Sequence, residues 1–114
     1  MKQQQIDTYK RVYARDGYRC CKCGETDQSK LQIAHRIRQG TKTQKNAAIK
    51  YIQSFIRDEI GERWSMERVW NDVIYHQFNL VCSCAKCNSS FNIFNNRIAT
   101  EILLNSILDD INSA

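Results

Sequence analysis

The sequence predicts a small α+β domain assembled around one metal ion, and three observations lead to this prediction. Two Cys-x-x-Cys pairs, Cys20 with Cys23 and Cys84 with Cys87, lie far apart in the chain. Two short apolar stretches of strand character lie close to these pairs, and much of the remaining chain has the apolar spacing of helices. Residues 1–114 are expected to form one domain with a modest core, for which a structural metal is a common source of stability.

The charge balance of the chain is basic. Lys and Arg number 17 against 12 Asp and Glu, which gives a net charge of +5. The positive charges concentrate in the first two-thirds of the chain, whereas the tail after Arg97 carries only acidic ones. This asymmetry favours a partner that bears phosphate groups, and an ordinary solvated surface is the alternative.

The sequence also limits where in the cell the protein is expected. No apolar run of about 18 residues is present, so no membrane span is predicted. The first five residues are polar, which argues against a secretion signal and favours a cytoplasmic protein. Thiols stay reduced in such a compartment, so the six cysteines are expected to bind metal rather than form disulfides.

The first third of the chain is expected to hold a helix, a cysteine loop and a strand. Residues 5–15 have apolar side chains at helical spacing. Residues 18–24 form a tight loop around the first cysteine pair, and glycine relaxes the backbone after the second ligand. A strand over residues 31–37 places His35 on its apolar face.

Two further helices are predicted in the middle of the chain, over residues 43–60 and 66–75. Gly61 closes the first helix, and Ser65 is the predicted N-cap of the second. Neither helix carries obvious chemistry. We interpret residues 43–75 as an insertion that packs on the core.

The second strand is expected over residues 78–83, and a helix should start near Cys84 or Ala85. That helix would carry Asn88 and Asn92 one turn apart on one face. A last helix is predicted from about residue 97 to residue 111. Four of its apolar side chains are expected to face inward: Ile98, Ile102, Leu103 and Leu108.

The paired cysteines are the strongest chemical signal. Two residues between ligands let a turn aim both sulfurs at one ion, and two such turns complete a tetrahedral site. Cys20, Cys23, Cys84 and Cys87 are therefore predicted to bind a structural Zn²⁺, with six ordinary buried cysteines as the alternative. Cys21 could replace Cys20, but only Cys20 has the two-residue spacing. Zinc removal is expected to unfold the domain.

Several segments follow one another in a distinctive order: residues 16–20 and 23–24 with the first cysteine pair, 31–35 ending in His35, 79–81, and 84–88 with the second cysteine pair and Asn88. This order resembles that of the HNH endonuclease family, which belongs to the ββα-metal superfamily. The resemblance covers roughly residues 10–40 and 77–93, and the helical insertion is longer than the usual connection in that family. It implies a ββα-metal core with a two-stranded antiparallel hairpin, and an enzyme that hydrolyses phosphodiester bonds of DNA with a divalent metal.

The resemblance implies roles for three residues. His35 would be the general base that activates water, Asn79 would brace the loop between the strands, and Asn88 would help to hold the catalytic Mg²⁺ or another divalent metal. A neutral histidine can take a proton from water, and an Asn oxygen is a hard ligand of the kind such ions need. Closing the zinc site would bring His35 and Asn88 into one small space. Taken singly, each of these residues has a structural interpretation as a core histidine, a turn residue or a cap.

One position departs from the family pattern. A charged or histidine ligand commonly precedes the general base, and this chain has Ala34 there. Asn92, one predicted helical turn beyond Asn88, could supply a replacement oxygen for the catalytic metal. His76 is a second candidate for that metal, and either residue could equally be structural.

Arg36, Arg38 and Lys86 are placed to hold DNA phosphates, with solvated surface charge as the alternative. A non-catalytic zinc-containing DNA-binding module derived from an HNH fold is the main alternative function, and Ala34 favours it. A protein-interaction module, with residues 43–75 as its contact surface, is a third. A nuclease with one such site would cut both strands as a homodimer or by two sequential nicks.

Overall fold

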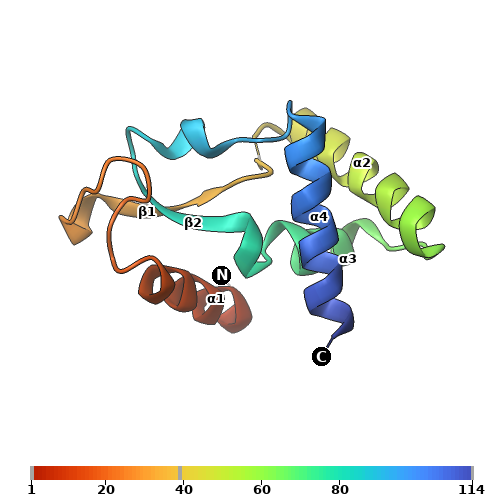
Figure 1. The fold of residues 1–114 in the computed structure, drawn as a ribbon, viewed down its shortest axis with the longest axis horizontal. Helices are drawn as coiled ribbons and strands as arrows, with labels where there is room; N and C mark the ends of the chain where they lie inside the picture. Colours follow the sequence, from red (N-terminus) through yellow and green to blue (C-terminus); the bar gives the residue numbers. More distant parts are fainter. Residues whose placement is uncertain (1, 39, 114) are drawn as a thin grey trace.

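The computed structural model describes residues 2–38 and 40–113. The two strands and α1 lie toward one end of the long axis and α2 toward the other, in a molecule of 44 × 29 × 25 Å (Figure 1). No helix in these two ranges is long and apolar enough to cross a membrane. The elements in chain order are α1 (Gln3–Arg15), η1 (Gln28–Lys30), β1 (Leu31–His35), α2 (Lys42–Ile60), α3 (Met66–Val69), η2 (Trp70–Ile74), η3 (Gln77–Asn79), β2 (Leu80–Cys84), η4 (Asn88–Phe91) and α4 (Arg97–Asn112).

The strands β1 and β2 form a two-stranded antiparallel sheet. Leu31 pairs with Cys84 at one end of the register, and His35 pairs with Leu80 at the other. This arrangement confirms the predicted α+β class with its antiparallel strand pair. β1 ends at His35 and not at Ile37, and β2 starts later than predicted because η3 precedes it.

Helix α1 packs against β2 and is anchored there by two neighbouring residues of opposite charge. The Arg15 guanidinium donates to the carbonyl oxygens of Gln77 and Leu80 at 2.8 and 2.6 Å. The Asp16 carboxylate accepts the Cys82 N–H at 2.8 Å and also pairs with Arg15. These bonds fix the chain that leads into the first cysteine loop relative to the second strand.

Helix α2 occupies the predicted range to within one residue. Thr41 and Gln44 form a capping box at its start, and Gly61 ends it in the left-handed conformation with φ of 70°. Its apolar face joins α3, η2 and α4 in the main core. The buried core residues are Ile37, Ala48, Ile49, Ile52, Phe55, Ile56, Trp64, Val69, Val73, Ile74, Leu104, Ile107 and Leu108.

The single helix predicted over residues 66–75 consists of two segments of different pitch. Ser65 caps α3 as predicted, because its hydroxyl accepts a backbone N–H of the first turn. After Val69 the backbone widens into the π-helical segment η2, which closes with the Tyr75 N–H donating to the Trp70 carbonyl at 3.3 Å. The wider turn ends with Tyr75 beside the hairpin.

Helix α4 spans the predicted range, but its buried face differs from the prediction. Ile98 and Ile102 are 73% and 62% exposed. Thr100 is fully buried instead, and its hydroxyl donates to the Ile93 carbonyl at 2.9 Å. Apolar residues lie on more than one side of this helix, so spacing alone does not select the face that packs. The buried residues are Thr100, Leu104, Ile107 and Leu108.

The prediction of a helix after the second cysteine pair is wrong. Residues 88–91 form only the short 3₁₀ segment η4. The Ile93 N–H donates to the Arg36 carbonyl at 2.9 Å, which draws the following chain into an extended path beside the end of β1. This tertiary bond prevails over the weak helix propensity of the segment. Asn88 and Asn92 therefore do not share a helix face.

Candidate functional site

The four predicted zinc ligands gather where β1 begins and β2 ends. The Sγ atoms of Cys20, Cys23, Cys84 and Cys87 all lie within 4.8 Å of one another, and those of Cys23 and Cys84 are 3.6 Å apart. Sulfurs around a tetrahedral Zn²⁺ are separated by roughly 3.8 Å. The prediction that these cysteines form a cluster able to hold a metal such as zinc is confirmed.

Each cysteine pair is a turn closed by a backbone hydrogen bond. The Gly24 N–H donates to the Cys20 carbonyl at 3.0 Å, and Gly24 has φ of 80°, which favours glycine. In the second pair the Cys87 N–H donates to the Cys84 carbonyl at 3.2 Å. Each turn directs the two sulfurs of its pair toward the same point.

The four thiols influence one another's protonation. Burial opposes ionisation of Cys20, but N–H groups of Cys23, Lys22 and Cys84 lower its pKa to about 6. Hydrogen bonding with the Cys84 thiol raises the pKa of Cys87 to about 12. Negative charge on one sulfur thus holds protons on its neighbours, and a bound dication would replace those protons.

The structure selects Cys20 rather than Cys21 for the cluster. Cys21 is held along the second strand instead, since its N–H donates to the Cys82 carbonyl at 3.0 Å. Cys82 itself is fully buried and packs in β2. The two-residue spacing therefore identified the correct member of the adjacent pair.

Asn79 is fully buried before β2 and connects three segments of backbone. Its Oδ1 accepts the Ile37 N–H at 2.8 Å, and its Nδ2 donates to the Ile74 carbonyl at 2.8 Å. Its own carbonyl accepts the Arg36 N–H at 2.8 Å. These bonds hold the chain that directly follows His35 against the entry to β2.

His35 is the last residue of β1 and is half-buried. Its ring meets the Tyr75 ring edge-on, with centroids 5.3 Å apart and an interplanar angle of 89°. Desolvation by burial lowers the pKa of His35 to about 4. The imidazole is therefore neutral at neutral pH.

Asn88 contacts the opposite face of the same strand. Its Nδ2 donates to Gln32 Oε1 at 2.8 Å. Gln32 and His35 are an odd number of positions apart, so their side chains leave opposite faces of β1, about 10 Å apart along the strand. The structure therefore does not bring the His35 and Asn88 side chains into one small space.

The two residues considered as replacement ligands have partners within the protein. The Asn92 Oδ1 accepts the Phe94 N–H at 3.1 Å. His76 lies 2.8 Å from the Asp110 carboxylate through Nε2, and its Nδ1 accepts the Phe78 N–H at 3.0 Å. Nε2 of His76 thus connects this segment with α4, and Nδ1 caps η3.

The three basic residues predicted to hold phosphates come from two segments: Arg36 and Arg38 follow β1, and Lys86 follows β2. Arg38 and Asn92 line a shared cavity of about 250 Å³. Lys86 is exposed in the turn of the second cysteine pair. Arg36 is half-exposed, and both of its backbone polar groups are bonded.

Sequence reasoning misses three side chains that contact the site: Asp16, Gln32 and Tyr75. Asp16 has the sequence context of a turn residue, so its bond to the second strand is invisible without the fold. Gln32 alternates with apolar residues in β1, and this alternation is the one signal that points to a polar face. Tyr75 reaches His35 only because η2 widens the preceding turn.

The position before His35 carries no metal ligand. Ala34 is fully buried in the interior of the sheet. Within residues 2–38 and 40–113, no second group of three or more His, Cys, Asp or Glu side chains gathers closely enough to hold a metal.

Fold and site together define a class of protein: an α+β domain with a two-stranded antiparallel sheet and a four-cysteine cluster that can hold a metal such as zinc. No protein-family model, no curated protein and no solved structure matches this chain. The chemistry of the site is therefore the basis for assigning a function.

Proposed function

We propose that this chain is a zinc-stabilised HNH-type endonuclease that hydrolyses DNA phosphodiester bonds with the help of a divalent metal. The observation that carries the proposal is the position of Asn79. Its buried amide fixes the Ile37 backbone and hence the strand end that presents His35. The resemblance to the HNH family implies that Asn79, which lies between the two cysteine pairs, braces the loop between the strands. The bonds of its amide are of the kind that this role requires.

His35 is the general base in this proposal. Its low pKa keeps the ring neutral, so it can accept a proton from water at neutral pH. A base with a pKa near 4 is weak, but a phosphodiester anion beside the ring would stabilise the imidazolium and raise that pKa toward the working pH. The edge contact with Tyr75 limits the orientations that the ring can take.

Asn88 is the residue that would hold the divalent metal, through its side-chain oxygen. Such an ion supplies charge stabilisation at the phosphate and the leaving oxygen. Mg²⁺ usually keeps several waters and takes few protein ligands besides substrate phosphates. A single amide ligand is consistent with an ion that binds weakly and together with DNA. In this proposal Arg36, Arg38 and Lys86 would contact phosphates of the same DNA.

A non-catalytic DNA-binding module with the same zinc cluster is the second candidate. The buried Ala34 favours it, because no carboxylate stands where the family has a metal ligand. The placement of His35 and Asn88 on opposite faces of β1 favours it as well. In this function the cluster stabilises the hairpin, and basic residues bind the DNA backbone without cleavage.

A plasmid-nicking assay distinguishes the two candidates. Wild type, His35→Gln, Asn88→Ala and the exposed control Asn112→Ala are each tested with Mg²⁺, Mn²⁺ and Ni²⁺. We expect metal-dependent nicking by wild type and the control, and a loss of at least about 100-fold in His35→Gln, the usual scale for removal of a general base. Asn88→Ala should need a higher metal concentration.

Zinc content and a thermal melt of each variant show whether it is folded. Equal nicking by folded, zinc-loaded wild type and His35→Gln would contradict the endonuclease proposal. Absence of nicking together with salt-sensitive DNA binding would establish the second candidate in its place.

A further inference from the structure

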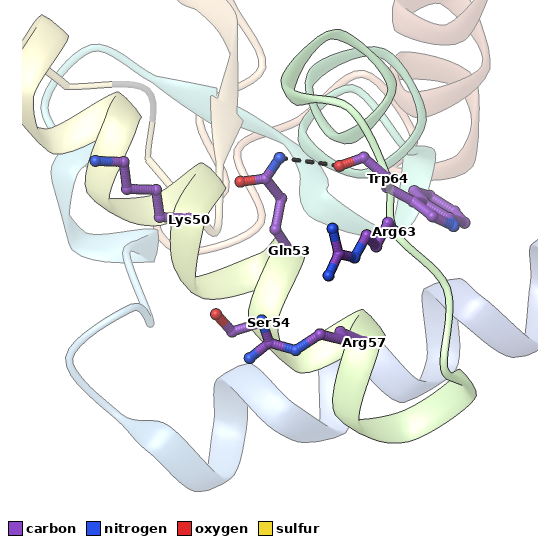
Figure 2. Close-up of a pocket in the computed structure, with 6 residues that line it drawn as sticks. All are labelled: Lys50, Gln53, Ser54, Arg57, Arg63 and Trp64. Carbon is purple, nitrogen blue, oxygen red and sulfur yellow. Dashed lines mark hydrogen bonds between the residues drawn. The ribbon is translucent and has the colours of Figure 1, made fainter.

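A basic hollow lies on the helical insertion, away from the hairpin (Figure 2). It has a volume of about 480 Å³. Its described lining contains three cations and no acidic side chain. The lining residues are Lys50, Gln53, Ser54, Arg57, Arg63 and Trp64.

The sequence builds this hollow from one helix face and the segment that returns along it. Lys50, Gln53 and Arg57 recur at helical spacing on α2, on the side opposite to its buried apolar stripe. Gly61 then reverses the chain, and the Gln53 amide donates to the Trp64 carbonyl at 2.9 Å. Figure 2 shows this bond and the Arg63 side chain, which comes from the returning segment beside α2.

The returning segment is fixed by its own contacts. Trp64 is 4% exposed and packs in the core, and the Arg68 guanidinium lies 3.7 Å from the centre of its ring. Glu62 accepts from the Trp64 indole N–H at 3.2 Å and faces Arg68 at 3.9 Å. The backbone that carries Arg63 is therefore held in place before any ligand arrives.

The three cations of the hollow are exposed and have little compensation from acids. Arg57 has one weak partner, since its Nε lies 3.7 Å from the exposed carboxylate of Asp58. Gathering like charges in one hollow costs free energy through their mutual repulsion, and a bound anion relieves that cost. An anionic ligand is thus the partner that this surface fits.

We propose that this hollow is a second nucleic-acid contact, in which Lys50, Arg57 and Arg63 bind phosphates along one strand of a DNA backbone. This inference rests on the proposed DNA partner, but it does not require cleavage. Lys50 and Arg57 are two helical turns apart, about 10 Å along α2, which matches the axial rise of about three nucleotides of one strand. Exposed cations spread over this length suit a polyanion better than one small phosphate.

The test measures DNA binding as a function of salt. Fluorescence anisotropy with a short duplex is recorded from 50 to 200 mM NaCl for wild type, for Arg57→Gln/Arg63→Gln and for Arg11→Gln/Arg19→Gln. The control pair removes the same two charges from exposed positions outside the hollow. All proteins are first checked for zinc content and melting temperature.

We expect the hollow variant to bind at least about tenfold more weakly than the control at 100 mM salt, with a salt slope smaller by about 2, one unit for each lost phosphate contact. Equal weakening of both variants would overturn the inference and leave the proposed DNA partner intact. No binding by wild type would overturn both. Displacement of the duplex by low-millimolar inorganic phosphate, from wild type but not from the hollow variant, would assign the hollow to a small phosphate and overturn the DNA contact.

Discussion

Burial and hydrogen bonding determine what each polar side chain of the hairpin can do. Asn79 is fully buried, and both polar atoms of its amide are bonded to backbone. His35 is half-buried and neutral, so its ring retains the capacity to take a proton. The Asn88 side chain is also an amide, and it donates to the amide oxygen of the partly buried Gln32 side chain. Asn79 is therefore a structural amide, His35 is a ring that can accept a proton, and Asn88 is an amide that pairs with another side chain.

The pH dependence of stability tests the environment of His35. Its pKa is about 4 in the folded protein and 6.5 in an unperturbed histidine, so the unfolded chain binds a proton first as the pH falls. The free energy of unfolding should therefore decrease from pH 7 to pH 5, by about 2 kcal/mol from this group alone. Urea unfolding of wild type and His35→Gln at both pH values measures the difference, because acid effects on the cysteines are common to both. Equal losses in the two proteins would show that His35 is not desolvated.

Removal of the Asn79 amide should be one of the most damaging substitutions in the hairpin. Asn79→Ala leaves the Ile37 N–H and the Ile74 carbonyl without partners in a buried setting. We expect a loss of about 3 kcal/mol in the free energy of unfolding, because each unsatisfied buried group costs about 1–3 kcal/mol. Chemical denaturation measures it, with the exposed Asn112→Ala expected to change by less than about 0.5 kcal/mol. A loss as small as that of the control would mean that the hydrogen bonds of the Asn79 amide are not needed for stability.

At the scale of elements, local chemistry sets where helices begin and end, and packing sets which face they bury. Thr41, Ser65 and Asn96 each accept a backbone N–H of the helix that follows. These ends depend on neighbours within four positions, so the sequence reveals them. The buried face of α4 depends on what it meets in space, and Ile98 and Ile102 remain exposed although their spacing is helical.

Gly61 gives a direct test of the end of α2. It has φ of 70°, and no atom lies within 4 Å of the position that a Cβ would occupy. The cost of Gly61→Ala is therefore backbone strain alone, about 1 kcal/mol. Gly61→Asn should cost less, because Asn tolerates the left-handed conformation. Thermal denaturation of both variants checks this order, and an equal or reversed order would show that the turn relaxes.

At the scale of the whole molecule, the cysteine cluster joins segments that are far apart in the chain. The first cysteine loop follows α1, and the second follows β2. Arg15 and Asp16 bind the backbone of β2 at Leu80 and Cys82, and the cluster joins the first cysteine loop to the end of β2. A bound metal would therefore link the first cysteine loop to the end of β2.

Metal removal should unfold the protein. Structural zinc contributes about 10–16 kcal/mol in small zinc domains, and a domain of this size has a total stability of about 5–15 kcal/mol. We expect one zinc per chain by elemental analysis and loss of cooperative melting after complete chelation. Cys87→Ser should lose the metal, whereas Cys21→Ser should keep it, since Cys21 lies outside the cluster. Retained helical content and an unchanged melting temperature after chelation would contradict this prediction.

The sequence by itself determined the metal cluster, the α+β class, the strand pair and most helix ends. These features depend on spacing and capping, which act over a few residues. The two-residue gap identified Cys20 over Cys21, and Gly61 and Ser65 marked the ends of their helices. The order of the two cysteine pairs and the strands also placed Asn79 at the entry to β2.

Only the tertiary structure decided which side chains meet. The Arg36 carbonyl drew Ile93 into an extended path and removed the expected helix after Asn88. Strand alternation placed His35 and Gln32, the partner of Asn88, on opposite faces of β1. The reversal after α2 gathered three cations into one hollow. The physical reason is the same in each case: these contacts join residues that are distant in the chain, and their energies outweigh the local preferences that a sequence displays.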